Sequence, residues 1–125
     1  MNVKRVRLAD VSTEDLVDRF AQIGVEQDQA LLGGQIAKFN RLFELMSDVS
    51  NELKARTGDH RRSLVRLYEY PNMQVRLKAA KHTLAVLPIE ARQQLESIAE
   101  THWMPQAEDA GMCLELLENG TFKPS

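Results

Sequence analysis

The sequence predicts an all-α protein, built as an α-α superhelix of about three antiparallel helix pairs. Two observations favour this fold class. Apolar residues recur at three- and four-residue spacing along most of the chain of 125 residues. Glycine and proline residues then divide this pattern into short segments joined by turns. The hydrophobic content of 43% and the charged content of 27% are ordinary for a globular protein and exclude a disordered one.

We expect a single helical-repeat domain over residues 1–125, because a chain of this length buries roughly two-thirds of its unfolded surface without a metal or disulfide. Residues 1–11 are expected to form an N-terminal arm, in which Val3–Leu8 weakly favours a strand. Residues 121–125 are expected to form a loose tail.

Several features indicate a cytoplasmic protein that does not contact a membrane. No apolar run approaches the roughly 20 residues that span a bilayer. The first seven residues carry positive charge, but no apolar segment follows them, so they are not a secretory signal. The lone Cys113 cannot form an internal disulfide, which favours a reducing compartment.

Capping signals and apolar stripes predict two long N-terminal helices. Ser12 and Asp15 have the spacing of a capping box and begin the first. The second spans about residues 35–57 and ends before Gly58. Leu45 lies off the apolar stripe of this helix and is a candidate contact with another helix or another copy. The stripe itself comprises Ile36, Phe39, Leu42, Phe43, Met46, Val49 and Leu53.

Four shorter helices are predicted after Gly58. Asp59 caps a helix that ends at Tyr70, because the residue before a proline leaves the helical region. Asn72 caps a helix that runs to about residue 87, and Pro88 begins the next. The last spans about residues 107–118, with an apolar side made of Met112, Cys113, Leu116 and Leu117.

Arg76 lies in the middle of an apolar helix face. Around it, at about 100° per residue, are Val75, Leu77, Ala79, Ala80, Leu84, Val86 and Leu87. The opposite face, expected to meet solvent, carries Gln74, Lys78, Lys81 and His82. A guanidinium in an apolar face must be paired, so we expect an ion pair or a carbonyl contact between helices, with a ligand anchor as the alternative. On this basis Arg76→Ala should destabilise the fold more than Lys78→Ala.

Charge is segregated along the chain, although the net charge is only −2. Residues 54–82 carry eight basic and two acidic residues, between flanks of net charge −3 and −5. Such a basic centre could bind a polyanion, or be neutralised within the fold or between copies. Aromatic residues make up only 6%, so nucleic acid is the less favoured partner. Its candidate contacts are His60, Arg61, Arg62, Arg66, Lys78 and Lys81.

No catalytic signature is present, so we expect no catalytic residue, no metal and no cofactor. The single cysteine and the three histidines lack the paired spacing of a zinc site. There is no phosphate-binding glycine loop and no nucleophile elbow. His102 is expected to be a core histidine and Cys113 a small core hydrophobe. A small enzyme without a recognisable motif stays open as an alternative.

Two resemblances support the helical-repeat fold. Residues 59–87, with Pro71, Val75-Arg76 and Ala79-Ala80, resemble the second half of a HEAT-type repeat, and residues 88–118 resemble a weaker second one. A wider resemblance involves Leu16–Phe20, Ile36–Asn40, Asn72–Ala80 and Gly111–Pro124, of which Asn72–Ala80 is shared with HEAT repeats generally and the other three are specific. Through them the chain resembles a small bacterial family of domain-of-unknown-function proteins. This resemblance implies a HEAT/armadillo-like fold and a bacterial source but no activity.

The leading hypothesis for function is a non-catalytic protein-binding helical-repeat module. Stacked helix pairs present side chains on a curved surface. The candidate binding residues are Arg76, Tyr68 and Tyr70, since arginine and tyrosine are frequent interface anchors. The partner is another protein, or a second copy of the chain, because a small solenoid has apolar ends that need covering. Nucleic-acid binding through residues 54–82 is the main alternative.

Overall fold

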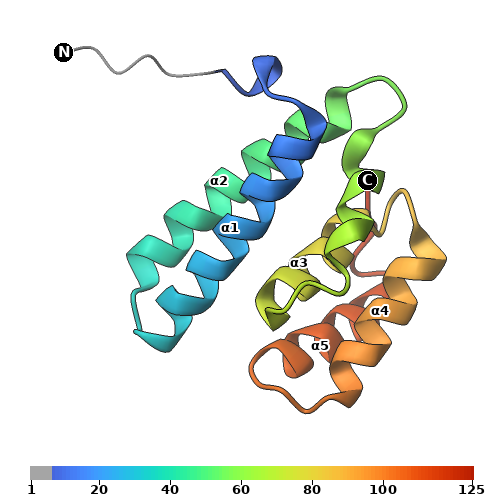
Figure 1. Cartoon of the computed structure of the whole chain (residues 1–125). Coiled ribbons are helices and arrows are strands. Elements are labelled where there is room, and N and C mark those ends of the chain that lie inside the picture. Colours follow the sequence, from blue (N-terminus) through green and yellow to red (C-terminus); the bar gives the residue numbers. More distant parts are fainter. Residues whose placement is uncertain (1–6) are drawn as a thin grey trace. The chain divides into compact units, whose positions relative to one another are not determined.

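The computed structural model describes residues 7–125, and these residues form helices and turns without a strand. The prediction of an all-α fold is confirmed; the superhelix stays a prediction. Most of Val3–Leu8 lies outside the described residues. The helices, shown in Figure 1, are η1 (Leu8–Asp10), α1 (Thr13–Leu32), α2 (Ile36–Ala55), η2 (His60–Leu67), α3 (Met73–Thr83), α4 (Pro88–Glu100) and α5 (Gln106–Glu118), where η denotes a 3-10 helix.

Contacts group the chain into two compact units, one ending at Ser63 and one beginning at Leu64. The single domain expected over residues 1–125 stays a prediction. None of the helices in residues 7–125 combines the length and hydropathy needed to cross a bilayer.

The first unit is a hairpin of α1 and α2, which lie side by side in Figure 1. The predicted cap is confirmed, because Ser12 Oγ accepts a hydrogen bond of 3.1 Å from the amide of Asp15. Gly34 has a φ of 65° in the turn between the helices, a conformation that glycine adopts without steric cost. The buried apolar residues of the two helices include Leu16, Phe20, Ala30, Leu42, Met46, Val49 and Leu53.

The apolar stripe predicted for α2 is wider than the face that is buried. Ile36 is 74% exposed, and Phe43 is also exposed. Ile36 belongs to the first turn of α2, beside the hairpin turn, where α1 has already ended at Leu32. Phe43 lies at the edge of the stripe, so a single partner helix does not cover it.

The third predicted helix is a 3-10 segment, η2, and Asp59 precedes it as expected. Its carboxylate accepts a hydrogen bond of 3.2 Å from the amide of Arg61, the second residue of η2, which is the bond that an N-cap makes. It also accepts one of 2.9 Å from Arg61 Nε, and Asp59 has a φ of 53° instead of the extended backbone of most N-caps. Leu64 and Leu67 of η2 are buried as expected, whereas Val65 is exposed.

The second unit packs α3, α4 and α5 around one apolar cluster. Asn72 caps α3 as predicted, since its Oδ1 accepts a hydrogen bond of 3.2 Å from the amide of Val75. The helix ends at Thr83, four residues earlier than expected. The cluster comprises Leu77, Ala80, Leu84, Ala91, Leu95, Ile98, Ala110, Cys113 and Leu117.

Two predictions about the C-terminal helices are wrong. His102 is exposed, because α4 ends at Glu100 and His102 lies in the following turn with a φ of 58°. Met112 is 57% exposed and Leu116 is 38% exposed, because the face that α5 packs inward is centred on Ala110, Cys113 and Leu117.

Replacing the cap of α3 tests how this helix begins. Asn72→Ala removes the acceptor of the Val75 amide, so we expect the free energy of unfolding to fall by about 1 kcal/mol. Urea unfolding followed by circular dichroism measures the change. Asn40→Ala, at an exposed position within α2, is the matched control and should change the stability by less than about 0.5 kcal/mol. Equal losses for the two variants would contradict the capping role.

Candidate functional site

A groove lies on one flank of the α1–α2 hairpin, with a volume of about 490 Å³. This volume is within the range of roughly 300–1,000 Å³ that is typical of ligand-binding pockets. We call it the α1–α2 groove; its lining residues are Leu8, Arg19, Gln22, Ile23, Leu45, Asp48 and Val49.

Helical spacing explains how each helix lines the groove. Arg19 and Ile23 are four residues apart and therefore share a face of α1. Leu45 and Val49 have the same spacing on α2, at the edge of the buried stripe. Leu45, which the sequence placed off that stripe, is 47% exposed. An apolar side chain that is half exposed in a groove is available to an apolar partner group.

Two charged residues of opposite sign line the groove on different helices. Arg19 comes from α1 and Asp48 from α2, and both are exposed. The sequence analysis did not single out Arg19, Gln22 or Asp48, since charged and polar residues are common on solvated faces.

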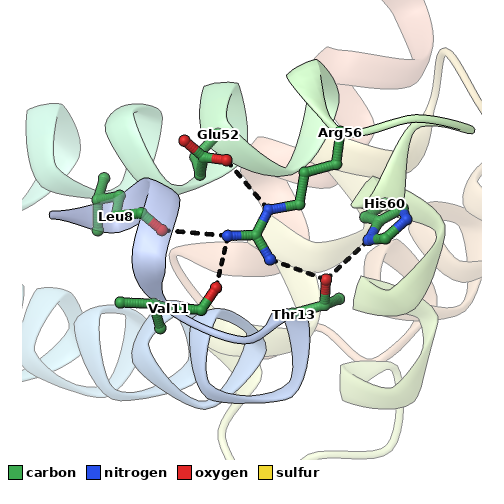
Figure 2. A network of polar contacts seen from close by, with 6 residues as sticks. All are labelled: Leu8, Val11, Thr13, Glu52, Arg56 and His60. Carbon is green, nitrogen blue, oxygen red and sulfur yellow. Dashed lines mark hydrogen bonds and ion pairs between the residues drawn. The ribbon is translucent and has the colours of Figure 1, made fainter.

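Arg56 holds the N-terminal turn that contributes Leu8 to the groove (Figure 2). Its Nη2 donates to the carbonyl oxygens of Leu8 at 3.1 Å and Val11 at 2.5 Å. Its Nη1 donates to Thr13 Oγ1 at 3.0 Å, and its Nε donates to Glu52 Oε2 at 3.0 Å. One guanidinium therefore joins the end of α2 to the chain before and at the start of α1.

His60 extends this network from the beginning of η2. Its Nδ1 is 2.7 Å from Thr13 Oγ1. Because Thr13 Oγ1 accepts from Arg56, its hydroxyl hydrogen is available to donate to the ring nitrogen. In this arrangement Nδ1 of His60 is the acceptor and Thr13 is the donor. The sequence analysis missed this network, because it joins residues more than 40 positions apart.

The three leading candidate binding residues contact their own unit. Arg76 Nε donates to the carbonyl oxygen of Tyr70 at 2.6 Å. The predicted carbonyl contact is therefore present, but it reaches back to the chain just before α3 and not to another helix. Thr83 Oγ1 donates to Ala79 O, so the hydrogen bond of 2.6 Å between Tyr68 and Thr83 takes its proton from the tyrosine. Burial raises the pKa of the Tyr68 hydroxyl.

Two of the basic residues expected to contact nucleic acid form ion pairs with carboxylates of their own unit. Arg61 is buried and forms an ion pair of 2.6 Å with Asp59, which lowers the pKa of that carboxyl. Lys81 Nζ is 2.9 Å from Asp109 Oδ1. Arg62 and Arg66, the remaining arginines of the set, are exposed on η2.

The prediction that Lys78 and Gln74 face solvent is wrong. Lys78 is only 6% exposed, and Gln74 is buried with its Oε1 accepting a hydrogen bond of 3.0 Å from Gln106. The arrangement of residues at 100° per residue predicted one buried face of this helix, whereas α3 contacts both α4 and α5. Burial, together with the charge of Lys81, lowers the pKa of Lys78 to about 8. The prediction that Arg76→Ala destabilises the fold more than Lys78→Ala assumed an exposed Lys78, and this assumption is wrong.

The α1–α2 groove offers apolar, polar and charged side chains for binding. Among residues 7–125, no group of three or more histidine, cysteine, aspartate or glutamate side chains is placed to hold a metal ion. Cys113 is buried, and burial raises the pKa of its thiol, so the reactive thiolate is disfavoured.

Comparison with known proteins places the chain in a family. Residues 14–118 match the family described as "Domain of unknown function (DUF2019)". The chain belongs to this family. It is also similar to a protein of solved structure, RPA1889 from Rhodopseudomonas palustris CGA009. The two share 60% sequence identity and a TM-score of 0.93, over 97% of this chain and 100% of that one. Among curated proteins, no sequence matches.

These findings confirm the predicted resemblance to a family of domain-of-unknown-function proteins. The similar protein of known structure is bacterial, as the resemblance implied for its family.

Replacing the Arg56 guanidinium with a lysine ammonium group tests its role in this network. Arg56→Lys keeps the charge but cannot reach four acceptors in one plane, so we expect a loss of about 2–4 kcal/mol in the free energy of unfolding. Urea unfolding measures this loss. Arg41→Lys, at an exposed position of the same helix, should stay within about 0.5 kcal/mol of the wild-type protein. A small effect at position 56 would show that the network contributes little.

Lys78 should make stability depend on pH. Its pKa is about 8 in the folded protein and near 10.5 when unfolded, so between these values the unfolded state binds more protons. Within this interval, raising the pH stabilises the wild-type protein relative to Lys78→Met, by at most about 1.4 kcal/mol per pH unit. Below pH 8 both states are protonated and the difference is constant.

Urea unfolding of both proteins between about pH 7 and pH 10 measures the Lys78 effect. Lys78→Gln is the control, since neither replacement titrates and both should give the same slope against the wild-type protein. A difference that does not change with pH would show that Lys78 is solvated in the folded state.

Proposed function

We propose that this DUF2019 protein is a non-catalytic protein-binding module, which receives apolar side chains of a partner protein in its α1–α2 groove. The observation that carries the proposal is Leu45, a leucine that is 47% exposed in a groove of about 490 Å³. Removing this apolar surface from water favours binding.

The charged residues of the groove support a protein partner in a defined orientation. Arg19 and Asp48 stand on different helices and would pair with residues of opposite charge on either side of an inserted apolar side chain. Such pairs contribute more to orientation and specificity than to affinity. An amphipathic helix offers this combination, with apolar anchors at four-residue spacing and polar flanks.

The way the basic segment is used also favours a protein over nucleic acid. Arg56, Arg61 and Lys81 bind carboxylates of their own unit, and Lys78 is buried. Each of these contacts reduces the charge of residues 54–82 that could meet phosphate groups.

We propose that the helices form one HEAT-like repeat domain over residues 1–125, and that the protein acts in the cytoplasm, where a lone cysteine stays reduced. A second copy of the chain is the alternative occupant of the groove.

Affinity capture from a lysate of the native host tests the groove. We expect a discrete protein that the wild-type bait retains after nuclease treatment, and that Leu45→Glu loses. Ile36→Glu is the matched control, because Ile36 is exposed on the same helix but does not line the groove. It should retain the protein. Material lost with nuclease would favour nucleic acid, and equal retention by both variants would contradict a role for the groove.

A further inference from the structure

The second unit has its own exposed apolar surface, separate from the α1–α2 groove. Met112 and Leu116 lie four residues apart on α5 and therefore share one face of that helix. Both are exposed, although both were expected in the core. Phe122 adds a third apolar side chain, since the chain after α5 turns back and the Phe122 amide donates to Leu116 O at 3.0 Å.

Two adjoining hollows follow this surface. One has a volume of about 280 Å³ and is lined by Lys81, Asp109, Met112, Cys113, Leu116 and Phe122. The other has a volume of about 310 Å³ and is lined by Pro105, Glu108, Asp109 and Met112. Because the two share Asp109 and Met112 in their linings, they adjoin each other, and together we call them the α5 groove.

The charge around the α5 groove is predominantly negative. α5 carries Glu108, Asp109, Glu115 and Glu118 and no basic residue. At about 100° per residue, Glu108 and Glu115 flank Met112 on one side, and Asp109 lies on the other, beside Leu116. Lys81 of α3 contributes the one positive charge among the lining residues, and its ion pair with Asp109 offsets it.

We propose that the α5 groove binds a cationic amphipathic segment of a partner protein. The apolar side chains of the segment would pack on Met112, Leu116 and Phe122, and its lysine or arginine residues would face Glu108 and Glu115. Methionine suits such a surface, because its flexible side chain adapts to different apolar groups. The acidic flanks attract a basic segment and repel an acidic one, so charge selects the partner.

Fluorescence anisotropy with two synthetic peptides tests this proposal. One is a fluorescein-labelled helical peptide of leucine and lysine, and the other carries glutamate in place of each lysine. We expect the wild-type protein to bind the lysine peptide at least about tenfold more tightly than the glutamate peptide. Added salt should weaken the preference, since it screens exposed charges.

Variants separate the apolar and the charged contributions. Met112→Gln and Leu116→Gln should each weaken binding of the lysine peptide severalfold, whereas Ile89→Gln, at an exposed position of α4, should not. The double variant Glu108→Lys/Glu115→Lys should reverse the preference toward the glutamate peptide. Glu96→Lys, an exposed charge change on α4, is its control and should keep the wild-type preference.

Three outcomes would overturn the proposal. The first is that the wild-type protein binds neither peptide. The second is that it binds both peptides equally. The third is that the α5 variants and the α4 controls bind the lysine peptide alike. Circular dichroism of each variant shows whether its helices are intact, so a loss of binding is not confused with unfolding.

Discussion

The first unit depends on one guanidinium. Arg56 at the end of α2 donates four hydrogen bonds to acceptors that lie before α1, at its start and one turn back on α2 (Figure 2). The charge of the guanidinium strengthens these hydrogen bonds, and the carbonyl oxygens of Leu8 and Val11 gain a donor. Because the guanidinium is planar and rigid, it fixes the positions of the acceptors relative to one another. Leu8 is placed beside α1 and α2 in this way, and the α1–α2 groove includes it. The shape of the proposed binding site therefore follows from a contact that does not itself touch the partner.

Several residues of the basic segment contact groups within their own unit. Arg61 binds Asp59 and Lys81 binds Asp109, while Lys78 is buried at the cost of a lowered pKa. Exposed apolar side chains occur on several elements, and those on α2 and α5 supply the two proposed binding surfaces. Leu45 belongs to α2, and Met112 and Leu116 belong to α5; each of these helices buries only part of its apolar face.

Local signals in the sequence predicted the helices, and they failed where long-range contacts decide. Ser12 and Asn72 cap as expected, because a cap involves only the next few residues. The prediction of a solvent-facing Lys78 failed, because two other helices contact α3 and Lys78 is buried. The prediction that Met112 and Leu116 are buried failed for the opposite reason, because fewer neighbours cover α5 than its apolar content suggested. Leu45 was found as an outlier of the stripe, whereas Arg19 and Asp48 gave no signal that separates them from solvated charges.

The central claim is that Leu45 lies at a protein interface, and site-specific photo-cross-linking in living cells tests it most directly. A photoreactive amino acid at position 45 should form a covalent adduct with one discrete protein on irradiation. The same group at position 36, which is exposed on α2 but outside the groove, should form none. An adduct confined to position 45 is the result that our account predicts. Equal adducts at both positions, or none at position 45, would contradict it.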